Sequence, residues 1–294
     1  MSHYANFYHE YGYLIIPDLF SPQEIAGLRD ETARICRGDL GTISGLPAAQ
    51  FGDSDDDMQR RVLCIHFPHK LSHVMCDAMV HPRVVDVLTQ VIGPNVKCMQ
   101  SMLFIKSAGK PGQAWHQDED FIPTRDRSLC GVWIAMDDAT VENGCLWIIP
   151  GSHKPGILWE MKAQDDPAFD CADVSVGFPY RDEEAIPVEV KAGTVVFFNG
   201  YTLHRSLQNV ATTGYRRALV NHYMSAESLL PWRALKDGQW TAQLDHRDVV
   251  MVAGVDPYAW KGYEDVMQPH IRPEKEGGCK WVDPNAELVG QDDD

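Results

Sequence analysis

Apolar residues in the first third of the chain recur three and four positions apart, which is the spacing of helices with one buried face. The clearest case follows Ser21-Pro22-Gln23-Glu24, a capping box with proline at the first helical position. Ile25, Leu28 and Ile35 share one side of the helix that it opens, and Gly38 is its expected end. In all, the pattern predicts helices over 4–11, 22–38, 71–79 and 82–92, and a strand over 12–17.

From residue 94 onward the apolar positions form short runs separated by turn residues such as Asn143-Gly144 and Ala192-Gly193. These runs predict strands over 96–106, 130–136, 145–149, 187–190, 194–199 and 218–224. Helices followed by many short strands are typical of helices packed on a β-sandwich or jelly roll. We therefore predict a mainly β fold with some α structure: a double-stranded β-helix of the cupin-like jelly-roll type with an N-terminal helical layer.

No internal repeat or linker divides the 294 residues. We expect a single domain over 1–294, with a helical part over about 1–94, a jelly-roll core over about 95–226 and a C-terminal segment over about 227–294. Residues 38–60 are rich in glycine, serine and aspartate, and they predict a long surface loop. The final segment lacks periodicity and contains Trp232, Trp240 and Trp260, and we expect it to wrap back over the sandwich.

The charge balance limits the partners, because the chain has 26 lysines and arginines against 42 acidic residues and a formal net charge of −16. Nucleic acid and anionic membrane surfaces both need clustered positive charge, so neither is an expected partner. No apolar run approaches the roughly 20 residues that span a bilayer, and no export signal is visible at the N-terminus. The eight cysteines contain no C-x-x-C pair. Together these features favour a cytoplasmic protein.

The chemistry of the chain centres on Trp115-His116-Gln117-Asp118. If this stretch is extended, His116 and Asp118 point to the same face, because side chains alternate along a strand. A pair with this spacing is weak evidence by itself, since most such pairs lie on the surface. A second imidazole is available from His204, which follows the strand predicted over 194–199. Two histidines and one carboxylate with open positions suit non-haem Fe(II) oxygenases.

Arg216 extends this picture, because its planar guanidinium matches a carboxylate in two hydrogen bonds. At this point the order of the motifs resembles phytanoyl-CoA dioxygenase-type, Fe(II)- and 2-oxoglutarate-dependent oxygenases. The resemblance covers most of residues 4–226 in order. It rests on the segments 12–15, 100–102, 115–118, 131–138, 142–153 and 204–206, and on Asn209 and Arg216.

The resemblance implies that His116, Asp118 and His204 bind Fe(II) and that Arg216 pairs with the far carboxylate of 2-oxoglutarate. It also implies that the cosubstrate pocket is lined by Trp133 and Ser206, with Gln100 and Met102 on the strand beside it. Arg216 lies twelve residues after His204, one more than close relatives lead us to expect. Arg217 is the alternative, and only one of the two can point inward, because neighbours on a strand face opposite ways.

The implied reaction is hydroxylation of a small organic metabolite at an unactivated C–H bond, with O2 consumed and succinate and CO2 released. Halogenating relatives lack the carboxylate of the triad, so Asp118 favours hydroxylation over halogenation. Two alternatives remain open. One is a cupin-like metalloenzyme that uses the triad without 2-oxoglutarate and therefore has no need of Arg216. The other is a non-catalytic binding protein that kept the fold.

Several other polar residues near these motifs have structural explanations. His153 is expected to form a hydrogen bond rather than to bind metal, and His222 is expected to be a satisfied core histidine. His66 follows an apolar run and could face the pocket. Glu119 and Asp120 are interpreted as a solvated pair.

Overall fold

Two antiparallel β-sheets that face each other form the centre of the protein, as shown by the computed structural model, which describes residues 2–171, 173–228 and 248–272. The large sheet has the strand order β1-β10-β5-β12-β3-β2-β14, and β13 also pairs with β3. The small sheet has the order β4-β11-β6-β9, and β7 and β8 pair with each other. The predicted jelly-roll fold with a helical layer is confirmed.

The strands are Tyr13–Ile16 (β1), Cys64–His66 (β2), Val96–Ser107 (β3), Gln113–His116 (β4), Cys130–Ala135 (β5), Leu146–Ile148 (β6), Met161–Ala163 (β7), Asp173–Ser175 (β8), Ile186–Val188 (β9), Val195–Asn199 (β10), His204–Ser206 (β11), Tyr215–Ser225 (β12), Val250–Ala253 (β13) and His270–Ile271 (β14). The α-helices are His3–Tyr11 (α1), Pro22–Arg37 (α2), Asp55–Arg60 (α3), His73–Met79 (α4), Pro82–Val91 (α5) and Asp118–Phe121 (α6). Short 3-10 helices span Pro68–Lys70, Asp182–Glu184 and Ala259–Lys261.

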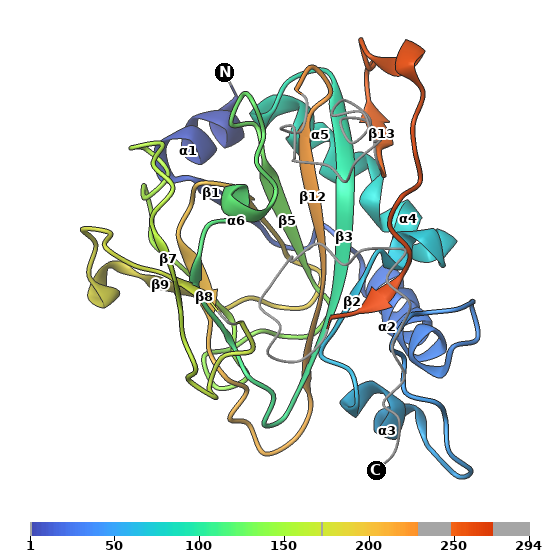
Figure 1. Ribbon diagram of the computed structural model, residues 1–294. Helices are drawn as coiled ribbons and strands as arrows, with labels where there is room; N and C mark the ends of the chain where they lie inside the picture. Colours follow the sequence, from blue (N-terminus) through green and yellow to red (C-terminus); the bar gives the residue numbers. More distant parts are fainter. Residues whose placement is uncertain (1, 172, 229–247, 273–294) are drawn as a thin grey trace, which may run out of the picture.

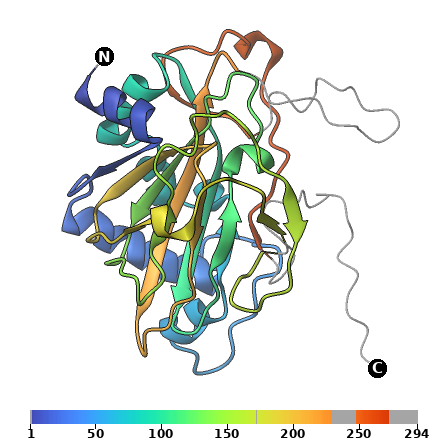
Figure 2. The ribbon, with the colours of Figure 1, turned by 90° about the vertical axis from the view of Figure 1, so that its left-hand side faces the viewer.

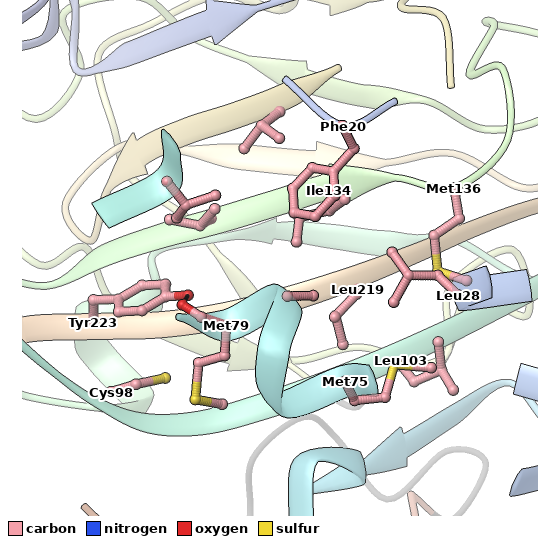
Figure 3. Close-up of a cluster of buried hydrophobic side chains, with 14 of the residues drawn as sticks. Phe20, Leu28, Met75, Met79, Cys98, Leu103, Ile134, Met136, Leu219 and Tyr223 are labelled. Carbon is pink, nitrogen blue, oxygen red and sulfur yellow. Dashed lines mark hydrogen bonds between the residues drawn. The ribbon is translucent and has the colours of Figure 1, made fainter. Parts of the chain in front are cut away.

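Helices α1, α2, α4 and α5 pack on the outer face of the large sheet, and the small sheet covers its inner face (Figures 1 and 2). Figure 3 shows the outer contact, where Leu28, Met75 and Met79 from helices meet Leu103, Ile134 and Leu219 from the sheet. The central strands are therefore buried on both faces, which explains their nearly continuous apolar runs. Along β5, for example, Val132 enters the outer core and Trp133 enters the core between the sheets.

The capping box at Ser21 forms as predicted. The hydroxyl of Ser21 accepts from the backbone N–H of Glu24 at 3.3 Å, and the Glu24 carboxylate accepts from the N–H of Ser21 at 2.6 Å. The prediction of one long loop over 38–60 was wrong at its end, because α3 begins at Asp55. Ser54 and Asp57 make a second capping box, and the three acidic residues of its first turn lie near the positive end of the helix dipole.

The described part of the C-terminal segment returns along the large sheet, where β13 pairs with β3 and β14 pairs with β2 (orange to red in Figure 1). Trp260 is 79% exposed, so this tryptophan does not pack on the sandwich. Trp232 and Trp240 lie outside the described residues. Within those residues, none of the helices has the length and apolar character needed to cross a bilayer.

Candidate metal centre

His116 and His204 face each other from neighbouring strands of the small sheet. His116 is the last residue of β4 and His204 is the first residue of β11, and the two are direct partners in the antiparallel register. Residues opposite each other in such a pair point to the same face. Their imidazole centroids lie 4.1 Å apart. The register of the sheet therefore brings together two histidines that are far apart in the sequence.

Asp118 joins them because the chain stays extended at Gln117, with φ −126° and ψ 126°, before α6 begins at Asp118 itself. The extended conformation expected for the motif thus holds only as far as Gln117. The Gln117 side chain points away and is fixed by hydrogen bonds to the backbone of Ile157, Trp159 and Tyr201. Asp118 Oδ1 lies 3.7 Å from His116 Nε2 and 3.5 Å from His204 Nε2.

The hydrogen bonds of both histidines leave Nε2 free for a ligand. His116 Nδ1 donates to the carbonyl of Ala114 at 2.7 Å, and His204 Nδ1 donates to the carbonyl of Thr202 at 3.0 Å. Because a carbonyl can only accept, Nδ1 of each ring carries a proton, and Nε2 is the nitrogen left to bind a ligand. Metal-binding histidines are commonly oriented by this kind of contact.

The environment favours the protonation states that metal binding needs. Burial, reinforced by the neighbouring His204, lowers the pKa of His116 to about 3, so its imidazole is neutral. Burial alone would raise the pKa of Asp118, but the imidazoles of His204 and His222 lower it below its ordinary value. One ligand atom from each triad residue lies within 4.8 Å of the others, and the three residues are buried. Two imidazoles and one carboxylate therefore form a donor set that fits a divalent ion such as Fe(II).

His222 also belongs to this site, which its interpretation as a satisfied core histidine missed. Its Nε2 donates to Asp118 Oδ2 at 3.1 Å, whereas its Nδ1 is buried without a partner. The alternation along β12 places His222 on the same face as Arg216, three pairs of residues further along the strand. That alternation, counted from Arg216, is the sequence signal that could have identified it.

Arg216 lines a cavity together with His116, Asp118 and His204, whereas Arg217 points away from it. Arg217 forms a two-point ion pair with Asp137, from Nε to Oδ2 at 2.8 Å and from Nη2 to Oδ1 at 2.9 Å. Arg216 is 3% exposed, and its guanidinium carbon lies 5.7 Å from the ring centroid of Trp133. Burial lowers the pKa of Arg216 to about 10, which leaves it charged at neutral pH.

Three of the five residues expected around the cosubstrate line this cavity: Arg216, Trp133 and Met102. Ser206 and Gln100 are outside the set of lining residues. The Ser206 hydroxyl accepts from Lys106 Nζ at 3.0 Å and from the backbone N–H of Gln113 at 3.2 Å. Gln100 bonds through its Nε2 to His66 Nδ1 at 3.0 Å. The remaining lining residues are Phe104, Gln113, Phe121, Ile122, Leu146, Cys171, Asp173, Phe198, Val220, His222 and Arg272.

The neighbours Glu119 and Asp120 do not form the solvated pair that was expected. Asp120 is exposed, but Glu119 is 1% exposed and accepts hydrogen bonds from the N–H and the hydroxyl of Thr124. Burial raises the pKa of Glu119 to about 7. His153, by contrast, behaves as expected, because its Nε2 donates to the carbonyl of His9 at 3.0 Å.

Comparison with known proteins places this geometry in a family. Residues 8–218 match the model of the phytanoyl-CoA dioxygenase (PhyH) family. A phytanoyl-CoA dioxygenase of Arabidopsis thaliana is 27% identical over 253 residues, which cover 76% of this chain and 88% of the plant protein. A phytanoyl-CoA dioxygenase 1 of Oryza sativa subsp. japonica is 29% identical over 251 residues, covering 75% of this chain and 88% of the rice protein.

Solved structures share the fold. The non-haem, alpha-ketoglutarate-dependent carbocyclase SnoK from nogalamycin biosynthesis aligns with a TM-score of 0.58 and 23% identity, covering 81% of this chain and 89% of that one. EctD from S. alaskensis with bound Fe aligns with a TM-score of 0.59 and 20% identity, covering 79% of each chain.

Proposed function

The chain belongs to the phytanoyl-CoA dioxygenase family of non-haem iron- and 2-oxoglutarate-dependent oxygenases, and on this premise we propose that His116, Asp118 and His204 bind its Fe(II). The observation that carries the proposal is the convergence of three distant, buried ligand atoms within 4.8 Å of one another. Iron(II) bound there, together with 2-oxoglutarate and O2, supplies the oxidation and releases succinate and CO2.

The protein's own contribution begins with the carboxylate of Asp118. His222 donates to Oδ2, so Oδ1 is the oxygen left for the metal, at similar distances from both imidazoles. A carboxylate held in this way would offer one oxygen to the ion, which would leave other positions for 2-oxoglutarate and O2. Because this carboxylate is present, we propose hydroxylation rather than halogenation.

Arg216 is the residue proposed to hold the far carboxylate of 2-oxoglutarate. It is a buried cation, and in the described residues no carboxylate pairs with it; its Nε donates to the carbonyl of Gly144 at 3.1 Å. Lys106, which is its direct partner in the β12–β3 register, is also buried. Burial and the neighbouring Arg216 lower the pKa of Lys106 well below its ordinary value, and an anionic ligand would offset the cost of burying the charge of Arg216. An enzyme that used the triad alone would have no need of Arg216 here.

We propose a small organic metabolite as the substrate and the cytoplasm as the compartment. The cavity wall is largely apolar, with Phe104, Phe121, Leu146 and Val220 among its residues, as suits a compact organic molecule. Curated relatives are called phytanoyl-CoA dioxygenases, but the sequence has no cluster of lysines and arginines that fits the phosphates of coenzyme A. A free metabolite therefore fits better than an acyl-CoA thioester.

The test is release of succinate from 2-oxoglutarate by the purified protein, measured with and without added Fe(II) while small metabolites are screened for stimulation. Wild-type protein should require Fe(II), and His116→Ala and His204→Ala should each remove the activity. His153→Ala is the matched control, because His153 bonds to the backbone of His9 and should leave turnover unchanged. Equal activity in the triad variants would contradict the assignment.

A further inference from the structure

Arg272 enters the cavity from the C-terminal segment, which none of the motifs above includes. It follows β14, and its backbone N–H donates to the carbonyl of Cys64 in β2 at 3.0 Å. Its guanidinium carbon lies 5.3 Å from the ring centroid of Phe104, and the residue lines the same cavity as the triad. The side chain is only 5% exposed. A cation is thus placed inside the cavity by a strand pairing remote from the metal ligands.

The hydrogen bonds of this guanidinium are incomplete. Nη2 pairs with Asp170 Oδ2, whereas Nη1 is buried and has no acceptor among the residues that the structure describes. Asp170 Oδ1 also lacks a donor, so the ion pair is made at a single point. Asp170 is anchored on the side of the small sheet, where its N–H donates to the carbonyl of Gly112 at 2.9 Å. A buried N–H without an acceptor is unfavourable, and a ligand oxygen would satisfy it.

Arg272 and Arg216 occupy different parts of the cavity. Arg216 lies over Trp133, which belongs to β5, and Arg272 lies over Phe104, which belongs to β3. In the large sheet β5 and β3 are the two neighbours of β12, the strand that carries Arg216. The two guanidinium groups therefore lie over strands on opposite sides of β12.

We propose that Arg272 anchors the carboxylate of the substrate, which makes the substrate a small organic acid with an apolar body. The inference rests on the proposed function, because it assigns Arg216 to 2-oxoglutarate. Arginine is suited to this role because its planar fork matches a carboxylate. The apolar body would contact the cavity wall formed by Phe104, Phe121, Ile122 and Val220. Held at its acidic end, the molecule would present a carbon to the metal centre in one orientation.

The experiment compares acids with their uncharged amides. The full-length protein, loaded with Fe(II) and 2-oxoglutarate under argon, is titrated in a calorimeter with hexanoate, decanoate, benzoate and phenylacetate, and with the four matching primary amides. At least one acid should bind about tenfold or more tightly than its amide, which is the discrimination that one charged hydrogen bond gives. Failure of all four acids to outbind their amides would overturn the inference.

Two variants test whether Arg272 binds the substrate carboxylate or only joins the two sheets through its ion pair with Asp170. Asp170→Asn keeps Arg272 but removes the ion pair, and the double variant Asp170→Asn with Arg272→Met differs from it only at Arg272. We expect Asp170→Asn to keep the preference for acids, and the double variant to lose it while binding 2-oxoglutarate within about twofold of wild type. If Asp170→Asn already loses the preference, Arg272 serves only to join the two sheets.

A separate calorimetric titration of the Fe(II)-loaded variants with 2-oxoglutarate distinguishes substrate from cosubstrate as the source of the carboxylate that Arg272 binds. Weaker binding of 2-oxoglutarate in the double variant than in Asp170→Asn would assign Arg272 to the cosubstrate and overturn its assignment to the substrate. If the wild-type protein binds neither Fe(II) nor 2-oxoglutarate, the proposed function fails and this inference fails with it. Normal cosubstrate binding with no acid preference overturns only the inference.

Discussion

Replacing Arg216 with methionine, with Arg217→Met as the matched control, tests the direction in which β12 presents its side chains. The two arginines are adjacent, yet Arg216 is 3% exposed inside the cavity and Arg217 pairs with Asp137 on the other face of the sheet. Of the two, only Arg216 lines the cavity, so it is the one proposed to meet the far carboxylate of 2-oxoglutarate. Methionine keeps much of the volume of the side chain and removes the charge.

The size of the effect follows from the burial of Arg216. Removing one partner of a buried, hydrogen-bonded charge pair costs about 2–5 kcal/mol, which corresponds to roughly 30-fold to 5000-fold in the dissociation constant of 2-oxoglutarate. Arg217→Met should leave that constant unchanged and lower the free energy of unfolding by about 1–3 kcal/mol, because it breaks the ion pair with Asp137.

The assay is an anaerobic titration of the Fe(II)-loaded protein with 2-oxoglutarate, followed by the weak visible charge-transfer band of the chelate. A dissociation constant for Arg216→Met within threefold of wild type would refute the assignment of the cosubstrate carboxylate. A large loss in Arg217→Met at unchanged stability would show that the other arginine faces the ligand.

Three further results are expected. His222→Leu should weaken Fe(II) binding by about 10- to 100-fold, whereas His222→Gln, whose amide can still donate to Asp118, should retain most of the wild-type affinity. Equal Fe(II) affinities of the two variants in a metal titration would contradict the orienting role of His222. Gly112→Ala should lower the free energy of unfolding by about 1–3 kcal/mol, because its Cβ would lie 2.0 Å from the carbonyl oxygen of Ser206. Gly27→Ala in α2 has open space at its Cβ and should raise the free energy of unfolding by about 0.5–1 kcal/mol. Urea denaturation measures both changes. Burial lowers the pKa of His69 to about 4. Between pH 6.5 and pH 4 the unfolded chain therefore binds a proton at His69 that the folded protein does not bind, and the free energy of unfolding should fall as the pH drops through this range. In His69→Gln the slope of the free energy of unfolding against pH should decrease by up to about 1.4 kcal/mol per pH unit. Denaturation at several pH values measures this slope, and an unchanged slope would refute the prediction.

Local patterns in the sequence were sufficient for the helical layer and for part of the site. The capping box at Ser21 and the helical spacing that follows it are interactions within a few residues, so α2 could be predicted with its true start. The pair His116 and Asp118 could be recognised because a single extended residue, Gln117, puts both side chains on one side. Each of these features depends only on the conformation of a short segment.

Features that depend on pairing between distant strands could not be read in this way. β14 has two residues, and its partner β2 lies about two hundred positions earlier, so neither strand has a distinctive pattern of its own. Arg272 is brought to the cavity by that pairing and therefore carried no signal. His222 was visible as a buried histidine, but its contact with Asp118 depends on how β12 faces the small sheet. The choice between Arg216 and Arg217 needed the same information.

The most direct test of the central claim is a crystal structure grown under argon with Fe(II) and 2-oxoglutarate. We expect one ion in direct contact with His116 Nε2, Asp118 Oδ1 and His204 Nε2, chelated by the keto-acid end of 2-oxoglutarate, whose other carboxylate meets Arg216. An ion bound by a different set of side chains, or a cosubstrate that leaves Arg216 without a partner, would contradict it.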